Sequence, residues 1–157
     1  MVKDKEYFGK QLVDNRLMNS GVEVDAFEEA VIALCDIPSL ENIALFVQAF
    51  DDNCEAYDVM FGLVHALEAQ DSAEVRTEEY VEQLLLAVPL FTAAASEWAE
   101  VVFLRMLNSE QHHQILKQKL GSTSQEIKAK VRTIVENIYQ RDPQRFEIKC
   151  NFLLEEL

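Results

Sequence analysis

Apolar residues recur every three or four positions along nearly the whole chain, the spacing that places them on one face of an α-helix. One predicted helix carries on a single face Val24, Phe27, Ala30, Val31 and Leu34. Strand-like alternation is absent, and runs of β-branched residues are short. Only 4 of the 157 residues are glycine. The pattern predicts an all-α protein.

Helix start and stop residues divide the chain further. Ser39 is a predicted N-cap after Pro38, the run from Thr123 to Glu126 reads as a capping box, and Asp142 before Pro143 is a strong helix start. We expect about nine helices on these grounds. They cover roughly 3–15, 21–35, 40–50, 55–69, 77–88, 96–107, 109–120, 124–140 and the segment from 143 onward.

The predicted helices group into hairpins at 21–50, 55–88, 96–120 and 124–157. A spacing of roughly 35 residues suits stacked antiparallel hairpins in a right-handed α-superhelix of the HEAT or armadillo kind. No residue-level repeat supports this, so a compact helical bundle is the alternative. Because no linker interrupts the pattern, we expect one domain over residues 1–157. The predicted core comprises Phe27, Leu34, Leu45, Phe46, Phe61, Leu63, Leu67, Leu84, Trp98, Val102 and Ile134.

Acidic residues are concentrated in the first part of the chain. Between Leu17 and Val75 there are thirteen aspartates and glutamates and no lysine or arginine. Residues 1–100 contain 21 acids and 5 bases, whereas residues 101–157 contain 7 acids and 9 bases. Such a surface repels nucleic acid and anionic lipid and attracts basic proteins. We therefore expect a basic protein partner, although the acidity could instead serve only solubility.

The three cysteines, Cys35, Cys54 and Cys150, are far apart and lie beside apolar residues. Disulfide frameworks and zinc sites need closer pairs, so free thiols in a reducing compartment are expected. The charged N-terminal segment lacks the apolar core of a signal peptide, and no apolar run is long enough to cross a membrane. We expect a cytoplasmic protein that is monomeric when free.

Candidate catalytic and metal-binding residues do not form complete sets. Glu110 and His113 have the spacing used in di-iron bundles, but the second copy of that motif is missing. The acidic run that begins at Asp51 lacks the glycine and glutamate that an EF-hand requires. There is no phosphate-binding glycine loop, and His65 has no evident nucleophile partner. We expect no enzyme activity, no cofactor and no metal.

The helix predicted over 55–69 has an unusual stripe. Asp58, Gly62, His65 and Ala69 share one side of it. A mid-helix glycine costs about 1 kcal/mol relative to alanine, which suggests that something approaches closely at Gly62. A neighbouring helix of the same chain is the simpler interpretation. The alternative is a partner-binding groove with Gly62 at its floor and Asp58 and His65 at its rim. Trp98 is expected in the core, although tryptophan also anchors interfaces.

Several segments, in order and at consistent spacing, resemble the immunity protein 30 family. They are Asn15 to Met18, Ala26 to Ala30, Phe50 to Asn53, Asp58 to His65, Glu97 to Ala99, Arg105 to Asn108, and the late helix start at Asp142 and Pro143. The stretch from Val59 to His65 is the most specific of them. The resemblance implies a small cytoplasmic protein of bacterial polymorphic-toxin systems, such as contact-dependent growth inhibition, that neutralises the C-terminal domain of a toxin.

The residues and the resemblance lead to the same hypothesis, an immunity protein whose acidic helical surface covers a basic toxin domain. A nuclease is the expected toxin, since enzymes that act on nucleic acid need basic clefts. The alternative is a non-enzymatic helical scaffold or adaptor that binds a basic protein or peptide. The predicted partner-binding residues are Glu28, Asp51, Asp52, Glu55, Asp58, Gly62 and His65.

Overall fold

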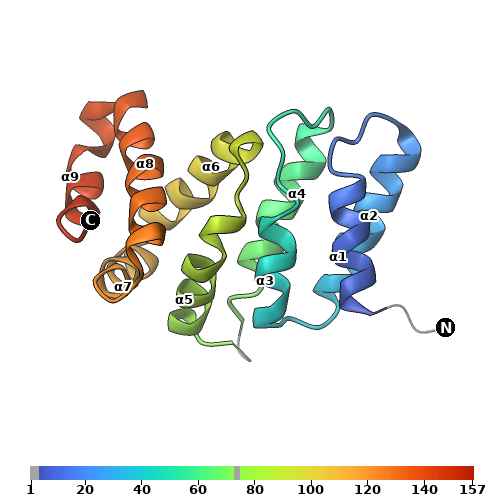
Figure 1. The fold of residues 1–157 in the computed structure, drawn as a ribbon, viewed down its shortest axis with the longest axis horizontal. Helices are drawn as coiled ribbons and strands as arrows, with labels where there is room; N and C mark the ends of the chain where they lie inside the picture. Colours follow the sequence, from blue (N-terminus) through green and yellow to red (C-terminus); the bar gives the residue numbers. More distant parts are fainter. Residues whose placement is uncertain (1–3, 73–74) are drawn as a thin grey trace.

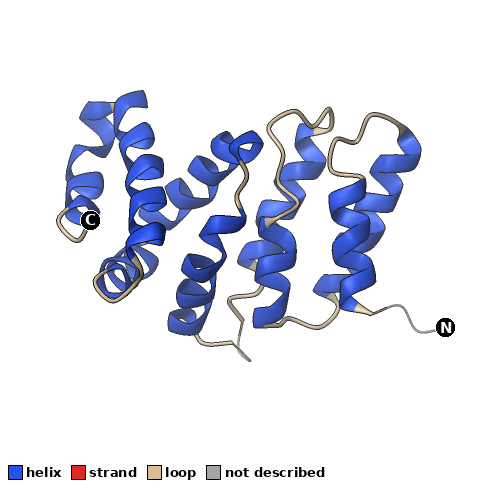
Figure 2. Ribbon diagram, in the orientation of Figure 1, coloured by secondary structure: helices blue, strands red, loops and turns tan. Residues whose placement is uncertain are grey.

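The structure is a computed structural model and describes residues 4–72 and 75–157. Within these ranges the chain forms nine α-helices and two short 3-10 helices, and no strand (Figure 2). The all-α prediction is therefore confirmed. The helices are α1 (Lys5–Asp14), α2 (Gly21–Cys35), α3 (Leu40–Val47), α4 (Tyr57–Glu68), α5 (Thr77–Ala87), η1 (Val88–Leu90), η2 (Ala93–Ala95), α6 (Ser96–Leu107), α7 (Glu110–Leu120), α8 (Gln125–Arg141) and α9 (Pro143–Leu154).

The helices follow one another along the long axis of the molecule, from α1 and α2 at one end to α8 and α9 at the other (Figure 1). The odd-numbered helices pack in series, α1 on α3, α3 on α5, α5 on α7 and α7 on α9. Among the even-numbered helices, α2 packs on α4 and α6 packs on α8. Most of these contacts thus join helices that are two positions apart in the chain.

The predicted helix pairs are correct in the second half of the chain. In the first half, the observed pairs are shifted by one helix from the predicted ones. The pairs α6 with α7 and α8 with α9 pack together as expected. In the first half, however, α1 pairs with α2 and α3 pairs with α4. The sequence grouping left the first helix without a partner, but its Leu12 is fully buried and anchors it to the stack.

Capping residues fix several helix ends as predicted. The Ser39 side chain accepts a hydrogen bond from the backbone of Glu41, and the Asp142 side chain accepts one from the backbone of Arg145 just after Pro143. Helix α8 is capped by Ser124 rather than by the predicted Thr123. Helix α3 ends three residues earlier than predicted and α4 begins two residues later, which lengthens the turn between them. The predicted start of the first helix at Lys3 lies outside the described residues.

Most of the predicted core is buried, including Trp98, which is 2% exposed. Two predictions are wrong. Phe61 is 40% exposed because the buried face of α4 runs through Met60, Leu63, Val64 and Leu67. Its ring packs edge-on against Trp98, with 5.3 Å between centroids and an interplanar angle of 75°.

Leu45, the other wrong prediction, is only half-buried at the contact between α1 and α3. A Cβ atom placed on Gly9 of α1 would lie 2.7 Å from Cδ2 of Leu45. The close helix approach that a glycine allows is therefore at Gly9. At Gly62, apart from its chain neighbours and the backbone of its own helix, no atom of the described residues lies within 4 Å of such a Cβ, so the interpretation that a neighbouring helix covers Gly62 is wrong.

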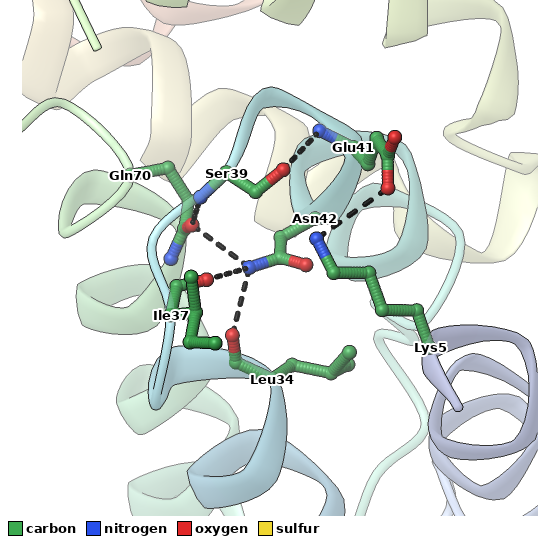
Figure 3. A network of polar contacts seen from close by, with 7 residues as sticks. All are labelled: Lys5, Leu34, Ile37, Ser39, Glu41, Asn42 and Gln70. Carbon is green, nitrogen blue, oxygen red and sulfur yellow. Dashed lines mark hydrogen bonds and ion pairs between the residues drawn. The ribbon is translucent and has the colours of Figure 1, made fainter. Parts of the chain in front are cut away.

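A buried polar network joins the α2–α3 connection to the end of α4 (Figure 3). The Asn42 side-chain amide donates to the carbonyls of Leu34 and Ile37 at 2.7 and 3.2 Å, and to Oε1 of Gln70 at 3.0 Å. Gln70 also accepts from the backbone of Ser39 and donates to the carbonyl of Ala66. These bonds satisfy carbonyls that the helix ends would otherwise leave unpaired.

All three cysteines are free thiols, as predicted. Cys54 and Cys150 are buried and Cys35 is half-buried. Burial raises the pKa of each thiol, and the carboxylate of Asp51 adds to the effect at Cys54. In the described ranges, no helix is long and apolar enough to cross a membrane.

The fully buried Leu67 of α4 provides a test of the core. We expect Leu67→Ala to lower the free energy of unfolding by about 2–5 kcal/mol, because the substitution removes buried methyl groups and leaves a cavity. Leu86→Ala, at a side chain that is 56% exposed, should change it by less than about 0.5 kcal/mol. Urea denaturation followed by circular dichroism measures both. Equal effects would show that α4 does not pack as described.

Candidate functional site

The acidic turn between α3 and α4 contains three of the predicted partner-binding residues, and two of them, Asp51 and Asp52, make contacts within the chain. Asp51 is 4% exposed. Its Oδ2 lies 3.1 Å from Nε of Arg16, and its Oδ1 accepts a hydrogen bond from the backbone of Asn53 at 2.8 Å. Because a buried carboxylate without its cation would be strongly unfavourable, this pair holds the turn against the end of α1.

Asp52 caps a helix that begins more than forty residues later. Its carboxylate accepts hydrogen bonds from the backbone of Glu97 at 3.1 Å and of Trp98 at 3.2 Å, in the first turn of α6. The residue at the N-cap position of α6, Ala95, has no side chain that could do so. A carboxylate at this position also interacts favourably with the helix dipole. Asp52 therefore acts as the missing N-cap and joins the α3–α4 turn to α6.

The other predicted carboxylates face solvent. Glu28 lies on α2, Glu55 lies in the turn just before α4, and Asp58 lies in the first turn of α4; all three are exposed. His65 is also exposed, one turn beyond Gly62, with Nδ1 3.8 Å from Oε1 of Glu68. These side chains remain available to a partner.

A groove of about 440 Å³ lies between α2 and α4. Three of the seven predicted residues line it: Glu28 from α2, and Asp58 and Gly62 from α4. The rest of its lining is apolar and consists of Val31, Ile32 and Val59. The groove thus combines an apolar floor with two carboxylates, an arrangement that fits a side chain with an apolar stem and a cationic end.

Gly62 lies in this lining with nothing above it. It is exposed, in mid-helix, and no atom of the described chain approaches the position of its missing Cβ. The internal packing therefore does not require a glycine here, although the residue weakens the helix. What the glycine does provide is room for an external group to approach the α4 backbone.

The sequence reasoning missed the apolar part of the groove. Ile32 is 71% exposed, because it lies outside the buried face of α2 that Phe27, Ala30 and Leu34 form. A large aliphatic residue next to Glu28 on the outer side of a helix is unusual enough to have indicated this surface. Val59 follows Asp58 on α4. Its place in the groove becomes evident only from the packing of α2 beside α4.

The candidate metal ligands Glu110 and His113 both lie on α7. His113 turns toward α9, where its ring nitrogen lies 3.1 Å from the Lys149 carbonyl and its ring packs on Phe152. Burial there lowers the pKa of His113. Among the residues that the structure describes, no three His, Cys, Asp or Glu side chains are placed to share a metal ion.

The capping role of Asp52 can be tested by its removal. We expect Asp52→Ala to lower the free energy of unfolding by about 0.5–2 kcal/mol, because the first turn of α6 loses its acceptor. The exposed neighbour Glu55 is the matched control, and Glu55→Ala should change stability by less than about 0.5 kcal/mol. Thermal and urea unfolding measure both. If Asp52→Ala were as stable as the control, Asp52 would be only a surface carboxylate.

Comparison with known proteins places the chain in a family. The model of the family described as Immunity protein 30 matches residues 14–116, which run from the end of α1 into α7. Helices α8 and α9, with the helix start at Asp142 and Pro143 that the resemblance included, lie outside this match. No curated protein and no solved structure gave a match. The matched segment covers about two-thirds of the chain, and the protein therefore belongs to the immunity protein 30 family.

Proposed function

We propose that this protein neutralises a cognate toxin by binding a basic surface of that toxin to the groove between α2 and α4. Membership of an immunity protein family implies a toxin as partner and a role as a non-enzymatic inhibitor. The binding surface is our inference from the structure. The observation that carries it is the open groove that Gly62 leaves between Glu28 and Asp58.

The charge around the groove supports a basic partner. Glu28, Glu55 and Asp58 are exposed, and the segment from Leu17 to Val75 offers no lysine or arginine to neutralise them. Exposed carboxylates steer a cationic protein toward this side of the stack and speed its association. The apolar floor at Val31, Ile32 and Val59 then provides area whose burial stabilises the complex.

The toxin that this surface fits best is a basic nuclease. Enzymes that bind nucleic acid carry lysine and arginine in their clefts to contact phosphates. Carboxylates presented by the inhibitor could occupy the same positions as those phosphates. Asp51 and Asp52 were also predicted to contact the partner. Their carboxylates instead pair within the chain and fix the turn that precedes α4.

We also propose that the stack is a HEAT-like superhelix in which α2 and α4 are successive helices of one layer. The serial packing of the odd-numbered helices supports this arrangement. In such stacks each helix pair contacts mainly its neighbours, and the extended side of a layer serves as a binding surface. A groove between two helices of one layer is then a natural place for a partner to bind.

The binding surface can be tested by reversing two charges. We expect Glu28→Lys with Asp58→Lys to slow association with the cognate toxin domain by about tenfold or more at low salt, and to leave cells unprotected against the toxin. Both residues are exposed on helices, so the variant should fold, which circular dichroism and thermal melting can verify. Stopped-flow or surface-plasmon measurements at several salt concentrations give the rates.

The matched control reverses two exposed acids outside the family match, Glu136 of α8 and Glu147 of α9. This variant has the same net charge as the first, so it separates a local effect from a general change in charge. It should protect cells as the unaltered protein does. If the control failed and the groove variant protected, the interface would lie in the C-terminal helices.

A further inference from the structure

Two aromatic side chains are exposed on the outer face of α4, beside the groove. Tyr57 is 49% exposed and Phe61 is 40% exposed. They lie four residues apart, so their side chains are neighbours on one face of the helix. His65 extends this face by a further turn, with 6.3 Å between the centroids of its ring and the ring of Phe61. We call Tyr57, Phe61 and His65 the aromatic row.

Trp98 of α6 supports the aromatic row from the core. The centroid of its buried indole ring lies 5.4 Å from that of Tyr57 and 5.3 Å from that of Phe61. Phe50 packs on the same indole at 6.0 Å. The hydroxyl of Tyr57 also donates to the backbone carbonyl of Asp52 at 3.3 Å. Because these contacts already order the two exposed rings, little further entropy is lost when a partner covers them.

Exposed carboxylates adjoin the aromatic row at its Tyr57 end. Asp58 follows Tyr57 directly and lies three residues before Phe61, which places it on the same side of α4. Glu55 precedes the helix, and both carboxylates are exposed. Partial burial raises the pKa of the Tyr57 hydroxyl, and the nearby carboxylate of Glu97 raises it further. Among the described residues, neither Glu55 nor Asp58 forms an ion pair, so this end of the row has an excess of negative charge.

At its other end, the aromatic row meets charges that pair within the chain. Oε1 of Glu68 lies 2.7 Å from Nε of Arg105 and 3.8 Å from Nδ1 of His65. Arg105 is therefore engaged by Glu68 and is not free to neutralise the carboxylates beside Tyr57. An external cation is thus attracted most strongly to the Tyr57 end of the row.

Aromatic rings and unpaired carboxylates together favour a guanidinium group. The face of an aromatic ring carries partial negative charge and attracts a cation. Arginine suits such a site better than lysine, since its flat and weakly hydrated guanidinium can stack on a ring while it donates to a carboxylate. Single exposed apolar residues are ordinary on protein surfaces, but a row of rings backed by a buried tryptophan has the composition of an interface hot spot.

We propose that the aromatic row receives an arginine side chain of the toxin, with the guanidinium against the rings of Tyr57 and Phe61 and paired with Asp58. This inference rests on the proposed function, because it names the group of the toxin that contacts α4. Gly62, next to Phe61, leaves the α4 backbone open between the row and the groove. One basic segment of the toxin can therefore cover both.

Two peptides test the recognition of arginine without the toxin. We expect the full chain to bind oligo-arginine about fivefold more tightly than oligo-lysine of the same length, because a guanidinium stacks on the rings better than an ammonium does. Phe61→Leu retains an apolar side chain of similar size but removes the ring, so it should abolish most of this preference. Tyr7→Leu, at an aromatic side chain of α1 that is 44% exposed, is the matched control and should retain it. Isothermal titration calorimetry gives the affinities, and thermal melting verifies that both variants fold.

A second variant at the same position keeps the shape of the ring. A ring-fluorinated phenylalanine in place of Phe61 packs against Trp98 as the native residue does, but its ring face is less negative. It should also weaken the preference for arginine. With the cognate toxin domain, both variants of Phe61 should dissociate about fivefold to thirtyfold faster, while the association rate changes little, because a short-range contact is lost.

The outcomes separate this inference from the proposed function. Equal affinity for the two peptides, or a preference for arginine that both variants of Phe61 retain, would overturn the assignment of arginine even if reversal of Glu28 and Asp58 prevents toxin binding. Unchanged dissociation of the toxin from both variants would overturn it as well. Loss of the preference for arginine, together with faster dissociation of the toxin, would establish it.

Discussion

The turn between α3 and α4 holds together parts of the chain that are distant in sequence. Asp51 is paired with Arg16 at the end of α1, while Asp52 supplies the N-cap that α6 lacks. Both interactions use a charged acceptor in a partly or fully buried position, where its loss is more costly than at the surface. The position of α4, and with it the groove between α2 and α4, depends on this turn.

The acidic residues on and around this turn fall into two groups, those that pair within the chain and those that face solvent. Asp51, Asp52 and Asp71 have partners within the chain, whereas Glu28, Glu55 and Asp58 face solvent. Carboxylates of the first group hold elements of the stack together, and we propose that those of the second group attract and contact a basic partner. Both groups are needed for a rigid acidic surface, since a partner binds more tightly to groups that are already in place.

Local rules were sufficient to predict the helices. Ser39, Asp142 and Pro143 marked helix ends correctly, and helical periodicity identified most of the core. The errors came from contacts between residues far apart in the sequence. Nothing near Asp52 indicated that it caps α6, and nothing near Gly9 indicated that the close helix contact lies there rather than at Gly62. Asp58 and Gly62 on α4 and Glu28 on α2 were predicted as binding residues, but the tertiary structure was needed to show that α2 and α4 place them in one groove.

We propose that the side of the stack formed by α2 and α4 contacts the toxin. Hydrogen–deuterium exchange, measured by mass spectrometry on the protein alone and with its cognate toxin domain, tests this claim without any substitution. We predict slower exchange of the backbone amides in α2, in the α3–α4 turn and in α4, and little change in α8 and α9. Slower exchange confined to α8 and α9, with α2 and α4 unchanged, would contradict it.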